Sequence, residues 1–244
     1  MAALMSGSGT NVQKILEHGE RLAKEEGQPL YEVAVIFTDR WNSRATRIGR
    51  DHDLPVITRD LSGWLKKHGV QRRDLSRREE FDREAVELLR PFEAKVAVYG
   101  GYMSIASSTL VRAFIGINVH PADLSVKTPE GKRRFVGAHA VRDAIVAGET
   151  AICSSTHLVT EEVDMGPLFL ISRPLAVEVP DNADLSDPKT AEEVEKKNQE
   201  RLKEAGDWVI FPQTLEAIAR GWFGRDENGN LYYKNNPAPD GLQL

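Results

Sequence analysis

Short apolar segments alternate with segments of helical periodicity through most of the chain. Apolar runs typical of buried strands occupy residues 2–5, 33–37, 54–57, 96–99, 115–120, 152–160 and 168–179. Apolar positions recur at helical spacing over residues 12–22, in a stretch ending near 52, and over 81–89, 110–114 and 138–147. This alternation predicts an α/β fold in which a mainly parallel, twisted sheet of Rossmann-like character carries helices on both faces.

Residues 59–80 depart from this alternation because they are rich in charge and poor in periodicity. We expect a surface insertion or a mobile connection there. Two capping boxes mark predicted helix starts, one formed by Ser76 and Glu79 and the other by Thr190 and Glu193.

The chain becomes more polar after residue 180. A charged helix is expected to end near Ala205, a second helix to span residues 211–219, and Asn228-Gly229 to turn a hairpin. We therefore predict an α/β domain over residues 1–180 and a helix-and-hairpin extension over 181–244 packed on it.

Composition narrows the classes of partner. The 244 residues contain 32 Lys and Arg against 37 Asp and Glu, a net charge of −5 that argues against a surface built to bind nucleic acid. No apolar run approaches the roughly 18 residues that cross a bilayer, and no secretion signal opens the chain. We expect a cytoplasmic monomer or homodimer without a membrane partner.

Cys153 is the only cysteine of the chain. A single cysteine excludes an intramolecular disulfide and any cysteine-rich zinc site. Because its neighbours Ile152, Ser154 and Ser155 suggest a strand, we expect a buried, unreactive thiol.

A loop rich in glycine and hydroxyl groups follows the first predicted strand, with the sequence Ser6-Gly7-Ser8-Gly9-Thr10-Asn11. A helix begins after it, and the free N–H groups of a helix N-terminus suit an anion such as a phosphate. The loop matches neither the dinucleotide fingerprint nor the P-loop, so a plain tight turn is an equal alternative.

Asn118 and His120 end the predicted strand over residues 115–120. Side chains two residues apart on a strand point to the same side, so both groups can donate hydrogen bonds to one point. Such a pair can stabilise the negative oxygen that develops when an acyl carbon is attacked. The alternative is a structural histidine with its hydrogen bonds satisfied inside the protein.

Residues 160–167 form a loop dense in carboxylates between two apolar strands. Loops at strand ends commonly carry catalytic groups, and Asp164 would favour the charged form of His120 if the two lie together. The alternative is an acidic surface loop. We expect His157, on the preceding strand, to be buried or to support the site from behind.

Taken in order, these motifs resemble those of the folate-dependent formyltransferases. The resemblance rests on residues 6–11, on Gly100-Gly101-Tyr102-Met103, on Asn118-Val119-His120-Pro121 and on residues 157–167, and it covers about residues 2–178. It is greatest toward members that formylate glycinamide ribonucleotide in purine biosynthesis. It implies formyl transfer from 10-formyltetrahydrofolate, as co-substrate and without a metal, to the amine of a small phosphorylated acceptor.

The resemblance also implies the site residues. They are Asn118, His120 and Asp164 for catalysis, with His120 protonated; Tyr102, Met103, Ser104, Ile105, Ala106, Thr160, Glu161 and Val163 for the folate; and Ser6, Gly7, Ser8, Gly9, Thr10 and Asn11 for the phosphate of the acceptor.

The sequence departs from the family pattern at three places. Ser104 stands where the family commonly has arginine, and Met165 replaces a glycine that usually follows the aspartate. The segment after the histidine is longer and basic, with four cationic side chains between Lys127 and Arg134. This basic segment is either solvated surface or a lid that closes over an anionic acceptor.

Other functions remain open at this point. Within the same fold, water can replace the amine, which would make the protein a 10-formyltetrahydrofolate hydrolase, or a different amine can be the acceptor. A catalytically idle module that binds folate or a nucleotide is the third alternative.

Overall fold

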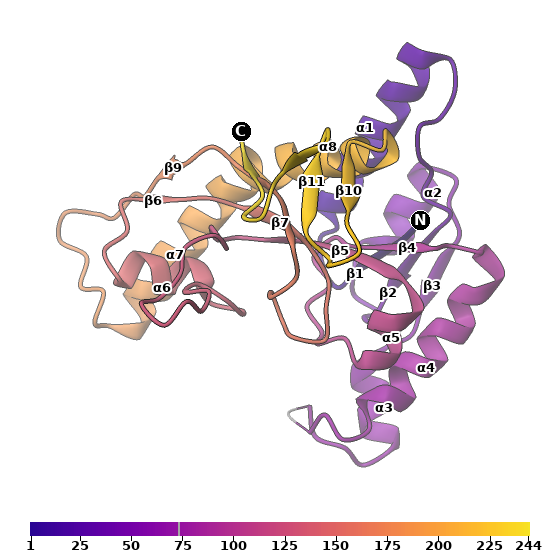
Figure 1. The fold of residues 1–244 in the computed structure, drawn as a ribbon. Coiled ribbons are helices and arrows are strands. Elements are labelled where there is room, and N and C mark those ends of the chain that lie inside the picture. Colours follow the sequence, from indigo (N-terminus) through magenta and orange to yellow (C-terminus); the bar gives the residue numbers. More distant parts are fainter. Residues whose placement is uncertain (73) are drawn as a thin grey trace. The chain divides into compact units, whose positions relative to one another are not determined.

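The structure is a computed structural model that describes residues 1–72 and 74–244. The chain divides into two compact units (Figure 1). The first comprises Met1–Asn118 with Val159–Glu161, and the second comprises Val119–Leu158 with Glu162–Leu244.

The first unit is built on parallel strands in the spatial order β3-β2-β1-β4-β5. These strands are β1 (Ala2–Met5), β2 (Val35–Thr38), β3 (Val56–Thr58), β4 (Val96–Tyr99) and β5 (Ile115–His120). The chain passes from the first unit to the second within β5, after Asn118. The predicted mainly parallel sheet is confirmed, as is its first strand.

Helices connect these strands. They are α1 (Thr10–Glu26), α2 (Ala45–Asp51), α3 (Leu61–Lys67), α4 (Arg78–Leu89), a 3-10 turn at Arg90–Phe92, and α5 (Ser108–Ala113). The connections between parallel strands therefore run through helices, as the alternating pattern predicts.

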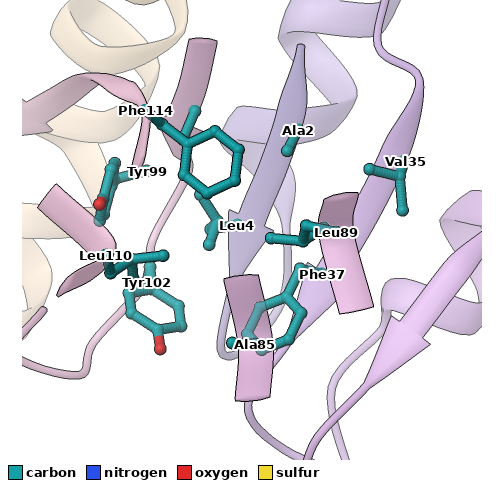
Figure 2. Packing of buried hydrophobic residues seen from close by; sticks show 11 residues of the cluster. Ala2, Leu4, Val35, Phe37, Ala85, Leu89, Tyr99, Tyr102, Leu110 and Phe114 are labelled. Carbon is teal, nitrogen blue, oxygen red and sulfur yellow. The ribbon is translucent and has the colours of Figure 1, made fainter. Parts of the chain in front are cut away.

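One face of the first unit's sheet packs against α4 and α5 (Figure 2). The cluster joins side chains of β1, β2 and β4 to side chains of α4 and α5 and to residues beside α5: Ala2, Leu4, Val35, Phe37, Ala97, Tyr99, Ala85, Leu89, Leu110, Tyr102 and Phe114. The alternate positions Ala3, Met5 and Ile36 are fully buried on the other face, as expected for strands covered on both sides.

The second unit contains an antiparallel pair, β7 (Ser155–Leu158) with β8 (Leu168–Ile171), and β13 (Leu242–Gln243) runs parallel to β8. Its other strands are β6 (Ala151–Ile152) paired with β9 (Leu175–Ala176), and the group β10 (Phe223–Arg225), β11 (Leu231–Tyr233) and β12 (Asn236–Pro237). Its helices are α6 (Ala140–Val146), α7 (Pro188–Leu202), a π-helical turn at Lys203–Asp207, and α8 (Trp208–Ala219).

The surface insertion or mobile connection expected over residues 59–80 contains helix α3, and residue 73 of this stretch lies outside the described residues. Trp64 explains the helix, since it is buried with Leu61 against Phe81 of α4. Asp60 caps the helix, its carboxylate accepting the Gly63 N–H at 2.6 Å. Burial of this tryptophan thus stabilises a helix in a segment that is otherwise rich in charged residues.

Both predicted capping boxes are also wrong. Helix α4 has Arg77 at its N-cap and no side-chain cap. Helix α7 is capped earlier than expected, by Asp187, whose carboxylate accepts the Thr190 N–H at 2.8 Å. Pro188 then occupies the first turn, where a missing N–H costs nothing.

The long strands predicted over residues 152–160 and 168–179 are each interrupted, giving β6 and β7 in one stretch and β8 and β9 in the other. The hairpin at Asn228-Gly229 is confirmed between β10 and β11. The division into domains at residue 180 stays a prediction. Within the described residues, no helix is both long and apolar enough to cross a membrane.

Replacing Leu4 by alanine tests the core of the first unit. We expect Leu4→Ala to lower the free energy of unfolding by about 2–5 kcal/mol, because it opens a cavity in a close-packed cluster. Urea unfolding followed by circular dichroism measures the loss. The matched control is Leu88→Ala on α4, where the leucine is 42% exposed and a loss of about 0.5 kcal/mol is expected. Equal losses at the two positions contradict this core assignment.

Candidate functional site

The glycine loop joins β1 to α1, as predicted. Gly9 adopts a φ of 67°, and a Cβ atom there would lie 2.5 Å from Met5 Cε and 2.6 Å from Ile48 Cδ1. Only glycine fits this close approach. Gly7 and Ser8 are exposed at the start of the helix, whereas Ser6 is buried and its hydroxyl oxygen accepts the Met103 N–H at 2.9 Å.

The segment Tyr102 to Ala106 leaves the carboxyl end of β4 and leads into α5. Met103 and Ile105 are 63% and 51% exposed, so the segment presents apolar side chains to solvent. Tyr102 is buried, and its hydroxyl accepts a hydrogen bond from Arg78 Nη2 at 3.1 Å. Ser104 donates its hydroxyl hydrogen to Asp39, a buried carboxylate that follows β2.

A buried ion pair on α4 supports this segment. Arg78 Nε lies 3.2 Å from Asp82 Oδ1, and the other carboxylate oxygen accepts the Ser107 N–H at 2.6 Å. Burial raises the pKa of Asp82, although the charge of Arg78 opposes the rise. Together with the bond to Tyr102, the pair holds both ends of the exposed segment. Sequence reasoning missed this pair; its only signal is a spacing of four residues on one helix.

Asn118 and His120 lie two residues apart on β5, so their side chains point to the same side of the strand. Asn118 is partly exposed, and His120 is buried. His120 Nε2 lies 3.1 Å from the carbonyl oxygen of Phe135.

The second unit brings together His120, His157 and Asp164, which are all buried. Asp164 Oδ2 lies 3.4 Å from His120 Nδ1, and Asp164 Oδ1 lies 3.5 Å from His157 Nε2. The Gly137 N–H donates to Asp164 Oδ2 at 2.9 Å. The predicted proximity of Asp164 to His120 and the predicted burial of His157 are therefore both confirmed, and the acidic surface loop is wrong for Asp164.

The backbone of Asp164 is left-handed, with a φ of 57°. A non-glycine residue in this region carries strain that its surroundings must compensate. The strained turn aims the carboxylate inward, toward the two imidazoles, instead of into solvent.

Burial and neighbouring charges act in opposite directions on the titratable groups of this cluster. Burial lowers the pKa of His120, and although the Asp164 carboxylate raises it, burial prevails. Burial alone would raise the pKa of Asp164, but the hydrogen bond with His157, the charge of His120 and the Gly137 N–H lower it to about 2. At neutral pH the Asp164 carboxylate is thus ionised. Both ring nitrogens of His120 face oxygen acceptors, Asp164 at Nδ1 and the Phe135 carbonyl at Nε2, and only a protonated imidazole can donate to both. The expectation of a protonated His120 stays a prediction, because burial opposes the charge of the ring and the Asp164 carboxylate favours it.

The remaining predicted folate residues belong to the loop after β7. Thr160 and Glu161 are part of the first unit, and Glu161 pairs with Arg112 at 2.7 Å. Val163 belongs to the second unit and is 54% exposed. These assignments remain predictions.

The cysteine of the chain lies in the second unit. Cys153 is buried as predicted, and burial raises the pKa of its thiol to about 11, which leaves it unreactive at neutral pH. Across residues 1–72 and 74–244, no group of three or more His, Cys, Asp or Glu could hold a metal ion.

Residues 1–205 match the protein family described as formyl transferase. The trifunctional purine biosynthetic protein adenosine-3 of Bos taurus is 27% identical over 233 residues, which are 95% of this chain and 19% of that protein. The chain therefore spans about a fifth of that relative's length. Phosphoribosylglycinamide formyltransferase of Haemophilus influenzae is 25% identical over 240 residues, or 98% of this chain and 92% of the relative.

Solved structures share the fold. The crystal structure of phosphoribosylglycinamide formyltransferase from Anaplasma phagocytophilum superposes with a TM-score of 0.70 at 19% identity, covering 100% of this chain and 96% of that one.

Replacing Asp164 by asparagine tests the coupling of the buried pair. Because the carboxylate is the group that raises the pKa of His120, we expect Asp164→Asn to lower that pKa further. The midpoint of the His120 ring signals in an NMR pH titration then moves to lower pH. An unchanged or higher midpoint shows that the two groups are not coupled.

Proposed function

This chain belongs to the formyl transferase family, and on that premise we propose that it transfers a formyl group from 10-formyltetrahydrofolate to the amine of glycinamide ribonucleotide. The observation that carries the proposal is the buried pairing of His120 with an ionised Asp164. His120 lies two residues after Asn118 on β5. The similarity to the Haemophilus influenzae phosphoribosylglycinamide formyltransferase, which extends over 98% of the chain, supports the choice of acceptor.

The folate supplies the formyl carbon and the nitrogen from which it leaves. Met103 and Ile105 support its place, because exposed apolar side chains on an irregular segment suit a flat heteroaromatic ring. The Met103 N–H donates to the Ser6 hydroxyl, and Arg78 donates to the Tyr102 hydroxyl, so that segment is held in place before any ligand arrives.

Three side chains have separate roles in the proposed reaction. The acceptor amine forms a bond to the formyl carbon, and the carbonyl oxygen of the formyl group becomes negative. When the carbonyl re-forms, the bond between the formyl carbon and the folate nitrogen breaks. Asn118 and His120 donate hydrogen bonds to that oxygen, and the His120 Nε2–H turns from the Phe135 carbonyl to do so. Asp164, ionised at neutral pH, accepts the amine proton directly or through a water and returns it to the leaving folate nitrogen.

The loop at the start of α1 is the proposed seat of the acceptor's phosphate. Gly7 and Ser8 are exposed there, and α1 is a helix of 17 residues whose N-terminus attracts anions. Gly9 lets the loop lie close to Met5 of β1 and Ile48 of α2, where a side chain would clash.

Incubation with 10-formyltetrahydrofolate, with and without glycinamide ribonucleotide, tests the proposal. We expect tetrahydrofolate release to require the ribonucleotide and to equal the formylated product in amount. Release without the ribonucleotide indicates hydrolysis instead. No release in either case contradicts this choice of donor and acceptor.

Replacing His120 by alanine tests its role. Loss of one donor to the developing oxyanion is expected to raise the barrier by about 2.7–4 kcal/mol, which is about a 10²- to 10³-fold drop in kcat. Stopped-flow or steady-state rates measure it. The control is His52→Ala, which removes a histidine that pairs with Glu20 at 2.7 Å in the first unit. A His120→Ala variant with near-normal turnover removes this residue from the mechanism.

A further inference from the structure

The basic segment after β5 is folded back on itself. Lys127 and Arg133 form an antiparallel bridge, and the Arg134 N–H donates to the Val126 carbonyl at 3.0 Å. Lys127 pairs with Asp240 at 2.8 Å, and Arg134 pairs with Glu149 at 3.0 Å. These two cations therefore serve contacts within the second unit.

Arg133 has a different partner. Its Nη1 donates to the carbonyl oxygen of Asp164, and its Nη2 donates to the carbonyl oxygen of Gly166 at 2.8 Å. The two arms of one guanidinium thus bind the backbone on both sides of Met165. The side chain is partly buried, so the two bonds are sheltered from water.

The same segment reaches Asp164 a second time. The Gly137 N–H binds the carboxylate while Arg133 binds the main-chain carbonyl, so residues 133–137 hold Asp164 at two points. This matters because Asp164 occupies a strained left-handed conformation, with a φ of 57°. Relaxation of that backbone would turn the carboxylate away from His120.

We infer that Arg133 is a positioning residue that locks the left-handed turn at Asp164 and so keeps the carboxylate against His120. The inference rests on the proposed function only for its effect on catalysis. The contacts of Arg133 with the turn at Asp164 do not depend on that function. It gives the basic segment a role that differs from that of a lid over the acceptor.

Arginine suits this role better than lysine. A planar guanidinium donates along two fixed, neighbouring directions, whereas an ammonium on a flexible chain is a single point donor. Arg133→Lys therefore keeps the positive charge and loses the fixed pair of bonds. Arg133→Met loses both.

The charged groups around the turn allow a positioning role of Arg133 to be distinguished from a purely electrostatic effect of its charge on His120. Asp164 and His157 face His120 from the loop after β7 and from β7 itself, and Arg133 faces Asp164, with Asp240 also acting on Arg133. The positive charge of Arg133 lowers the pKa of His120, whereas the nearby carboxylate raises it. Removing charge alone therefore shifts that pKa upward, and losing the carboxylate shifts it downward.

NMR titration of the His120 ring in the substrate-free full chain tests the inference, with Arg133→Met, Arg133→Lys, and Arg134→Met and Arg134→Lys as matched controls. We expect the midpoint to move to lower pH in both Arg133 variants and to stay in place in both controls. An upward shift in Arg133→Met with no shift in Arg133→Lys overturns the inference, because charge alone then explains the data. No shift in either variant also overturns it.

Kinetics give the second measurement. We expect kcat to fall about 10- to 100-fold in both Arg133 variants, with little change in KM for the acceptor, because a misplaced proton acceptor slows chemistry more than binding. A selective rise in KM favours the lid and overturns the inference. Should Arg133→Met not fold, Arg133→Lys carries the test. Absence of formyl transfer by the unaltered protein rejects the proposed function alone, since the titration needs no substrate.

Discussion

A buried carboxylate must be compensated by neighbouring donors, and the second unit meets this constraint at Asp164. Two imidazoles and the Gly137 N–H surround the carboxylate, and Arg133 holds the main chain of the same turn. Because these donors come from β5, β7 and residues 133–137, segments distant in sequence must meet before Asp164 can be buried as an anion. The position of the carboxylate matters for the expected chemistry, since a pKa of about 2 keeps it ionised at neutral pH but makes it a weak base, which can take part in proton transfer only when it is held beside the reacting group.

The first unit meets a different constraint. Its strands are parallel, so their carboxyl ends lie at one edge of its sheet, and irregular segments leave that edge from β1 and β4. Ser6 in the first segment binds Met103 in the second, while α4 supplies the buried Arg78 that binds Tyr102. These bonds fix the backbone while leaving Met103 and Ile105 exposed. A segment ordered in this way loses little entropy when it binds a ligand.

Periodicity and residue chemistry predicted the parallel sheet, the glycine loop, the C-terminal hairpin and the meeting of Asp164 with His120. The sequence pattern did not predict helix α3, because the helix is stabilised by burial of Trp64 against Phe81. The many charged residues around Trp64 leave no helical periodicity of apolar positions. The roles of Arg78 and Arg133 were equally hidden, since each depends on a partner more than twenty residues away. The burial that lowers the pKa of His120 is likewise not revealed by any spacing of residues.

The most direct test of the account follows the formyl carbon itself. Unaltered protein and Asp164→Asn are mixed, in excess, with 10-formyltetrahydrofolate carrying a ¹³C formyl group and with glycinamide ribonucleotide, and the acceptor is analysed by mass spectrometry after a single turnover. The account predicts that the label moves onto the acceptor amine, and that its transfer is slowed about 10²-fold or more when the carboxylate is lost. Label recovered as formate, or equal rates of transfer by the two proteins, would contradict it.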